Sequence, residues 1–252
     1  SAGRDAQYQG TVYHRQILGV YKLYDRLTRS FPHVLFESCA SGGARFDPGI
    51  LYYAPQGWVS DDTDGVERVK IQYGTSMCYP VSSMGSHVSV VPNHQLNRKT
   101  PLHTRANVAY FGTFGYELDL NKLSDEEISE VKQQITFMKE YRELIQFGTF
   151  YRLKSPFEGN ETVWMTVSED KKTALVFWYR ERNVVNADFT RVRLQGLDPD
   201  LIYRNEYNET ENYGDELMNL GLLTTDCTAG EPTSEDEPCT DYESRIYVLT
   251  AK

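Results

Sequence analysis

Hydrophobic and polar positions alternate in two different ways along the chain, and the change falls near Phe147. Before it, apolar residues recur at helical spacing in segments that alternate with short apolar runs typical of buried strands. Helices are predicted at 11–30, 66–73, 105–111 and 124–145, the last of them beginning with a capping box at 124–127. Strands are predicted at 33–37, 57–59, 83–91 and 114–118. Because alternating helices and strands indicate βαβ units and a parallel sheet, residues 1–146 are predicted to form about half of an α/β barrel.

Beyond Phe147 the apolar segments become shorter and follow a two-residue period. Strands are predicted at 148–153, 162–167, 173–179, 191–194, 201–203 and 245–249, with turn residues between them. This pattern is typical of an antiparallel β-sandwich, so a second domain is predicted over 147–252. The stretch from Asp215 to Asp241 is interpreted as a long acidic loop without a catalytic pattern.

Composition and charge narrow the classes of function. The 252 residues are 40% hydrophobic, enough for one large domain or two ordinary ones. The net charge of −10 opposes binding to nucleic acid or to anionic membranes. No apolar run is long enough to span a bilayer and no signal-peptide pattern occurs, so a cytoplasmic protein is expected.

Neither the cysteines nor the histidines form a recognisable metal site. Cys227 and Cys239 flank an acidic loop and could pair if oxidised, but they would stay reduced in a cytoplasmic protein. His87 and His94 have no carboxylate or third histidine at ligand spacing, so hydrogen-bonding roles are predicted for them. We therefore expect neither a metal nor a cofactor.

The stretch from Trp58 to Tyr73 is the strongest candidate for chemistry. A short apolar run ends there in three aspartates within four positions, and a helical pattern follows at once. Carboxylates between a strand and a helix lie at the mouth of an α/β barrel, where such folds carry their chemistry. The alternative is an N-cap cluster, in which Asp62 or Thr63 would satisfy free amides of the next helix. Both interpretations remain open on this pattern.

A loop of small residues, from Ser38 to Ala44, follows the predicted strand at 33–37. Its Gly42-Gly43 pair permits backbone conformations that other residues avoid and lets a ligand approach the main chain. A flexible turn is the alternative interpretation.

Several motifs, in order, carry a family likeness. They are Phe-Glu-Ser-Cys-Ala-Ser-Gly-Gly-Ala-Arg-Phe-Asp at 36–47, Pro-Gln-Gly-Trp-Val-Ser-Asp-Asp-Thr-Asp at 55–64, Ile-Gln-Tyr-Gly-Thr-Ser at 71–76, Met-Gly-Ser-His-Val-Ser at 84–89 and Pro-Asn-His-Gln at 92–95. Together they resemble the bacterial α-galactosidases of glycoside hydrolase family 36, over about residues 10 to 120.

The resemblance implies a fold and a set of site residues. The family consists of retaining glycosidases with a (β/α)8 barrel followed by a C-terminal β-sandwich, so this chain is expected to contain the C-terminal half of the barrel and the sandwich. Asp61 is implied as the general acid/base, with Asp62 as the neighbour that could be confused with it. Trp58 is expected to line the sugar pocket or to be buried as core. The implied galactose-binding loop comprises Cys39, Ala40, Ser41 and Gly42.

The resemblance also implies what the chain does not contain. A retaining mechanism needs two carboxyl groups roughly 5–5.5 Å apart, and the acid must keep its proton near neutral pH, for which we expect partial burial beside Trp58. The family's nucleophile is the aspartate of a Lys-Trp-Asp-Met-Asn-Arg motif, which does not occur here. We therefore expect it on a missing N-terminal portion that precedes Ser1.

The implied substrates are α-galactosides such as melibiose and raffinose, and the implied assembly is a homo-oligomer, a tetramer in relatives. Three alternatives stay open: an α-N-acetylgalactosaminidase, a transglycosylase of the same family, or a catalytically silent carbohydrate-binding fragment.

Overall fold

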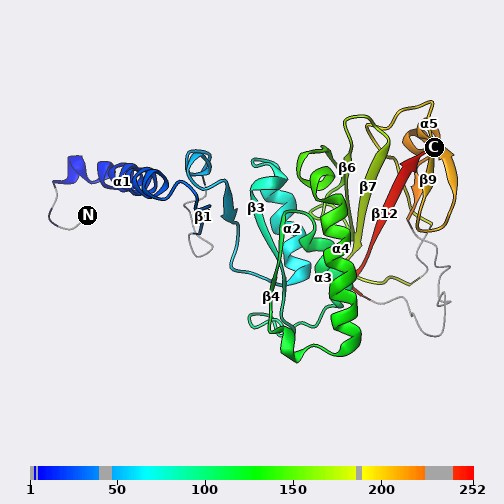
Figure 1. Ribbon diagram of the computed structural model, residues 1–252, viewed down its shortest axis with the longest axis horizontal. Coiled ribbons are helices and arrows are strands. Elements are labelled where there is room, and N and C mark those ends of the chain that lie inside the picture. The colour runs from blue at the N-terminus through cyan, green and yellow to red at the C-terminus, as the bar shows by residue number, and fades with distance from the viewer. Residues whose placement is uncertain (1–2, 4, 40–46, 186–188, 225–240) are drawn as a thin grey trace.

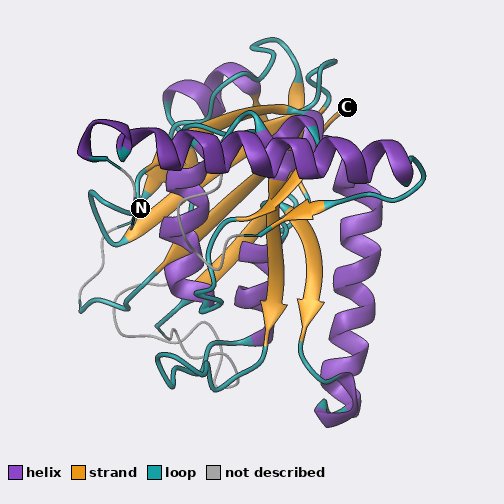
Figure 2. Ribbon diagram, turned by 90° about the vertical axis from the view of Figure 1, so that its left-hand side faces the viewer, coloured by secondary structure: helices purple, strands orange, loops and turns teal. Residues whose placement is uncertain are grey.

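The N-terminal half of the computed structural model is a four-stranded parallel sheet (Figures 1 and 2), and the structure describes residues 3, 5–39, 47–185, 189–224 and 241–252. The strand order is β1-β2-β3-β4, and every neighbouring pair is parallel. The strands are β1 (Glu37–Ser38), β2 (Gln56–Trp58), β3 (Met84–Ser89) and β4 (Thr113–Glu117). The predicted alternation of helices with parallel strands is therefore confirmed.

Strand β1 is shorter than predicted. The apolar run at 33–37 was expected to be a strand, but only its last residue, Glu37, belongs to β1. Val34 and Leu35 are exposed, with Leu35 90% accessible. The prediction failed because an apolar run becomes a strand only where a neighbouring strand pairs with it, and β1 begins pairing at Glu37, opposite Gln56 of β2.

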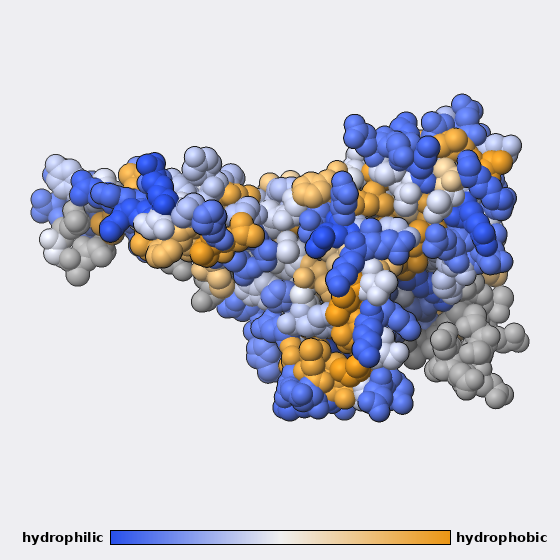
Figure 3. Space-filling view, viewed as in Figure 1, coloured by the Kyte–Doolittle hydropathy of each residue, from blue (hydrophilic) through white to orange (hydrophobic). Residues whose placement is uncertain are grey.

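Helix α1 (Gly10–Ser30) confirms the predicted first helix and extends away from the rest of the molecule (Figure 1). None of its residues is buried. Tyr13, Leu18 and Leu23 are at least half accessible, and the other large apolar residues between Val12 and Leu27 are partly buried. In the space-filling view, hydrophobic side chains are visible on the surface of this projecting part (Figure 3).

Three helices form the layer between the parallel sheet and the C-terminal sheet (Figure 1). They are α2 (Gly65–Ser76), α3 (Leu102–Ala109) and α4 (Asp125–Phe147). Helix α4 begins with the predicted capping box, in which Ser124 and Glu127 exchange side-chain and backbone hydrogen bonds. The short 3-10 helices are η1 (Ala6–Tyr8), η2 (Ile50–Tyr52), η3 (Val81–Ser83) and η4 (Leu120–Lys122).

The C-terminal half is antiparallel, as predicted. Its main sheet has the order β10-β9-β12-β7-β6-β5, and β11 pairs with β8 in a second, two-stranded sheet. The elements are β5 (Thr149–Lys154), β6 (Glu161–Val167), β7 (Thr173–Arg180), β8 (Arg191–Val192), β9 (Ile202–Asn205), β10 (Glu211–Tyr213), α5 (Gly214–Asn219), β11 (Leu222–Leu223) and β12 (Glu243–Ala251).

The predicted loop from Asp215 to Asp241 is wrong in its first part. Residues of this stretch form helix α5 and strand β11, and Leu217 and Leu222 pack into the core beneath the main sheet. Tertiary burial of these two leucines outweighs the acidic, loop-like composition around them. The rest of the stretch, with Cys227 and Cys239, lies outside the described residues.

The helix layer packs against both sheets through one continuous core. Phe111, just after α3, stacks on Trp164 of β6 with ring centroids 4.3 Å apart. Met84 and Val88 of β3 belong to the same buried cluster.

Within the described ranges, no helix is both long and apolar enough to cross a membrane.

Candidate active site

Asp61 lies just after β2, at the carboxyl edge of the parallel sheet. Its side chain is exposed, and it makes no hydrogen bond or ion pair with the part of the chain that the structure describes. The expected partial burial beside Trp58 is therefore wrong for this structure, because no described element covers the edge at that point. The carboxyl group is accessible to whatever occupies the space above the sheet.

The residue that caps the following helix is Asp64, not Asp62 or Thr63. The Asp64 carboxylate accepts hydrogen bonds from the backbone amides of Val66 and Glu67, at 3.0 and 3.1 Å. Asp62 is used differently, because its Oδ1 accepts from the Asp64 amide at 3.0 Å. The aspartate cluster thus divides into a cap, a turn-stabilising residue and a free carboxyl group, so capping leaves Asp61 available for chemistry.

The loop that carries Asp61 is held on both sides of it. The guanidinium of Arg68 lies 3.5 Å from the Ser60 carbonyl oxygen, at the outer limit of hydrogen bonding. After Asp61, the Asn93 amide donates to the Thr63 hydroxyl at 3.3 Å, and Arg98 forms an ion pair with Asp64. Asn93 belongs to the polar turn at 92–95, so this turn supports the aspartate loop.

The Trp58 ring is engaged by two neighbours. Cζ of Arg68 lies 4.5 Å from the ring centroid. The His87 ring, on β3, lies 4.6 Å away at an interplanar angle of 35°. His87 in turn lies 3.5 Å from the Glu117 carboxylate at the end of β4. Trp58 is half-buried, so it is neither a fully buried core residue nor a free stacking surface.

Arg68 is a buried cation directly beneath this site. Only 2% of the residue is accessible. Burial lowers the pKa of Arg68 to about 10, while the negative charges of Asp62 and Glu117 act in the opposite direction. Arg68 therefore remains charged at neutral pH, and its charge balances carboxylates at this edge of the sheet.

Cys39 lies at the same edge. It directly follows Ser38, which pairs with Gly57 in the β1–β2 ladder, so Cys39 lies at the level of Trp58 on the neighbouring strand. Cys39 is an exposed free cysteine. The other predicted members of the sugar-binding loop, Ala40, Ser41 and Gly42, lie outside the described residues.

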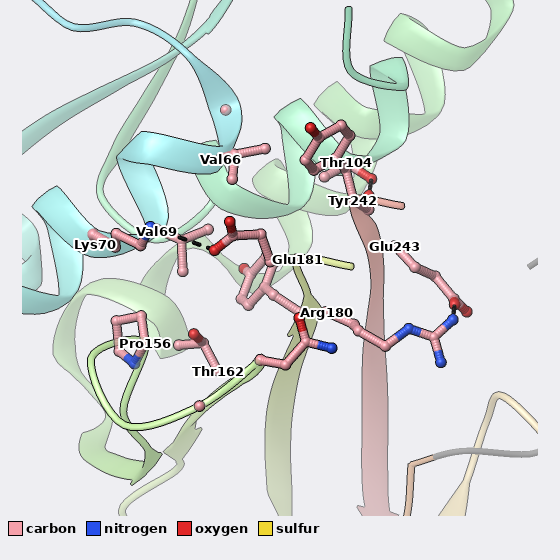
Figure 4. A pocket seen from close by; sticks show the side chains of 14 residues that line it. Val66, Val69, Lys70, Thr104, Pro156, Thr162, Arg180, Glu181, Tyr242 and Glu243 are labelled. Atoms are coloured by element: carbon pink, nitrogen blue, oxygen red, sulfur yellow. Dashed lines mark hydrogen bonds and ion pairs between the residues drawn. The ribbon is translucent and has the colours of Figure 1, made fainter. Parts of the chain in front are cut away.

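The small pocket in Figure 4 is a different feature, at the junction between α2, α3 and the antiparallel sheet. Lys70 and Glu181 face each other across it at 3.4 Å, and Thr104 donates to the Tyr242 carbonyl oxygen at 2.8 Å. The pocket offers about 30 Å³, which is room for about two water molecules. It is therefore too small for a sugar.

Residues 1–148 match the Melibiase family, and residues 161–249 match the glycosyl hydrolase family 36 C-terminal domain. The chain belongs to the melibiase family. The predicted family resemblance is thereby confirmed, and so is the predicted fold of a half-barrel followed by a β-sandwich, because solved α-galactosidases of glycoside hydrolase family 36 share this structure along its whole length.

Among the melibiase-family relatives, α-galactosidase AgaA of Geobacillus stearothermophilus is 56% identical over 209 residues, which is 83% of this chain and 28% of AgaA. α-Galactosidase 1 of Pediococcus pentosaceus is 49% identical over 243 residues, 96% of this chain and 32% of the relative. The crystal structure of the Lactobacillus brevis α-galactosidase superposes with a TM-score of 0.90 at 48% identity, covering 100% of this chain and 34% of that one. The chain thus spans about a third of the length of these relatives.

In this melibiase-family site, sequence reasoning missed Arg68 and the stack around Trp58. Arg68 lies within the predicted helix at 66–73, where the local pattern gives no sign of burial, although the structure buries it. Two glycines are the trace that the ring stack leaves in the sequence. Gly85 faces the Trp58 ring and Gly115 faces the His87 ring, and a Cβ atom on either glycine would lie within 3 Å of the ring that it faces. Among the described residues, no group of three or more potential metal ligands occurs.

Proposed function

We propose that this chain is the part of a retaining α-galactosidase that carries the general acid/base, Asp61, and part of the sugar pocket. The observation that carries the proposal is the position of Asp61: a free, accessible carboxyl at the carboxyl edge of a parallel half-barrel, in a loop fixed on both sides. Family membership supports it, since the relatives are named α-galactosidases. An accessible carboxyl on a fixed loop suits proton transfer to a leaving sugar oxygen.

The second carboxylate of the mechanism is proposed to come from barrel strands outside this chain. The other carboxylates around Asp61 are already engaged: Asp62 in its turn, Asp64 as a helix cap and ion-pair partner, and Glu117 with His87. In addition, β1 and β4 each pair on one side only within the described sheet. A closed barrel would pair both edges.

The substrate class is proposed from the relatives. Solved structures of AgaA variants with a replaced aspartate contain raffinose in one case and stachyose in another. We propose terminal α-galactosyl groups of such oligosaccharides as the substrate here, with Cys39, Trp58 and the 40–42 segment lining the sugar site. Assembly into a homo-oligomer remains a prediction from the family resemblance.

Replacing Asp61 with Asn in the complete enzyme, where this chain is joined to the remaining barrel strands, tests the proposal. Loss of a general acid should reduce turnover of substrates with poor leaving groups by about 10²–10⁴-fold and affect activated aryl α-galactosides far less. Azide should restore turnover of the activated substrates and yield the α-configured galactosyl azide, because azide enters from the face that Asp61 served.

The matched control is Asp62→Asn, one residue along the same loop. It should cost less than Asp61→Asn and show no dependence on the leaving group. A stronger, leaving-group-dependent loss in Asp62→Asn would move the acid to Asp62, and a β-configured azide product from Asp61→Asn would identify Asp61 as the nucleophile instead.

A further inference from the structure

Arg68 connects the two strands whose ends carry the site. It lies on α2, and its Nη2 donates to the Gly85 carbonyl oxygen of β3 at 3.0 Å. The same guanidinium contacts the Trp58 ring at the end of β2 and faces the Ser60 carbonyl oxygen. Ser60 is the residue immediately before Asp61. The buried Arg68 side chain therefore contacts the start of the loop that carries Asp61, the last residue of β2 and strand β3.

The geometry around Arg68 is closely filled. A Cβ atom on Gly85 would lie 2.9 Å from Cε3 of Trp58, and one on Gly115 would lie 2.8 Å from Cδ2 of His87. Only glycine at these two positions leaves the rings where they are. The Trp58 ring therefore has little freedom to move while Arg68 and His87 remain in place.

Burying an arginine at this position has a free-energy cost. Moving a cation out of water is unfavourable, and an apolar side chain of similar volume often stabilises a fold equally well. The lowered pKa of Arg68 reflects this cost. What an apolar residue could not provide is the donated hydrogen bond to Gly85, the cation–ring contact with Trp58 and the positive charge near Asp62.

We propose that Arg68 is a positioning residue for the general acid: it fixes Trp58 and the backbone at Ser60, and so sets the direction in which Asp61 presents its carboxyl group. The inference rests on the proposed role of Asp61. Arg68 itself does not reach the substrate, because it is buried beneath the loop.

The competing explanation is that Arg68 merely stabilises the sheet. The two explanations differ in what a substitution does to substrates of different leaving-group ability. A misplaced general acid slows the reactions that need a proton on the leaving oxygen and spares those that do not. A weakened fold lowers the amount of active enzyme and therefore affects all substrates equally.

The test uses Arg68→Met, which keeps most of the volume, and Arg68→Lys, which keeps the charge but not the planar guanidinium. Both are measured in the complete enzyme with a series of aryl α-galactosides of graded leaving-group pKa, together with the melting temperature. For the poorest leaving group we expect kcat/KM to fall about 10- to 100-fold, since an error of about 1 Å in placement can cost 10²-fold. For the best leaving group the fall should stay within about threefold.

Arg180→Met is the matched control. Arg180 is a comparably buried arginine, 5% accessible, but it lies on β7 and pairs with Glu243. Any loss of activity in this variant should be the same for every substrate.

Three results would overturn the inference. Arg68→Lys could match the unmodified enzyme across the series, either Arg68 variant could lose activity equally for all substrates, or Arg180→Met could reproduce the leaving-group dependence. If Arg68→Met does not fold, Arg68→Lys still decides. Asp61→Asn is measured with the same series of substrates. If its loss of kcat/KM does not depend on the leaving group, the proposed function fails. If the loss depends on the leaving group in Asp61→Asn but in neither Arg68 variant, only the positioning role of Arg68 is removed.

Discussion

Replacing Gly85 with Ala should disturb the Trp58 stack without touching any titratable group. Gly85 lies on β3, paired with Trp58 of β2. The added methyl group would lie 2.9 Å from Cε3 of Trp58 and 3.4 Å from the Gly57 carbonyl oxygen. The first distance is shorter than Cβ contacts in folded proteins and the second is at the lower limit of ordinary contact, so the ring or the strand must move.

The expected loss of stability in Gly85→Ala follows from the tight packing around the Trp58 ring. Trp58 is 4.5 Å from Arg68 and 4.6 Å from His87, measured to ring centroids. Inserting a methyl group into such packing typically costs about 1–3 kcal/mol. The alanine restricts the unfolded chain and returns about 0.4–1 kcal/mol. We therefore expect a net loss of about 1–2 kcal/mol in the free energy of unfolding.

Gly74→Ala is the matched control. Gly74 lies in the same α/β half, within α2, and a Cβ atom there would meet nothing within 4 Å. Alanine in the middle of a helix is favoured over glycine by about 0.5–1 kcal/mol. This variant should therefore be slightly more stable than the unmodified enzyme and equally active.

Urea unfolding and kcat/KM on aryl α-galactosides measure the two variants side by side in the complete enzyme. Gly85→Ala should be less stable and less active, with the larger loss of activity on poor leaving groups, because the displaced ring shifts the loop that carries Asp61. If Gly85→Ala is as stable and active as Gly74→Ala, the Trp58 ring is not held as described, and the reasoning about the stack is refuted.

Substitutions at two further residues address helix ends. Asp64→Ala removes the cap of α2 and the partner of Arg98, and should lower the free energy of unfolding in urea by about 2–4 kcal/mol. Asp64→Asn can still cap the helix and should recover about 1 kcal/mol of that loss. Equal losses for the two variants would show that the ion pair alone matters. Ser124→Ala breaks the capping box of α4 and should cost about 1 kcal/mol with unchanged kcat/KM; a change in kcat/KM would contradict its placement away from the site.

Local patterns predicted the elements that depend on local chemistry. Helical spacing located α1 and α4, and the capping box of Ser124 and Glu127 fixed where α4 begins. The aspartates after β2 were placed correctly at the sheet edge. The identity of the capping aspartate was missed because Asp62, Thr63 and Asp64 are all good N-caps, and only the backbone path selects Asp64.

Features that depend on contacts between distant segments could not be read from the sequence. Arg68 resembles a solvent-exposed helix residue until β3 and Trp58 pack around it. The carboxyl group of Asp61 is exposed although partial burial was expected. The sequence pattern could not predict this exposure, because it gives no information on what covers the sheet edge. Leu217 and Leu222 lie in an acidic stretch, and only the core beneath the main sheet explains their structure.

The C-terminal sheet also contributes to the aspartate loop. Tyr242, which precedes β12, lies with its ring 5.4 Å from Cζ of Arg98, and its carbonyl oxygen accepts from Thr104 of α3. Arg98 pairs with Asp64 in the loop itself. This chain of contacts links the antiparallel half to the loop through one arginine. The helix layer also shares its core with both sheets, through Phe111 and Trp164. The β-sandwich therefore contributes contacts to the support of the loop as well as the barrel does.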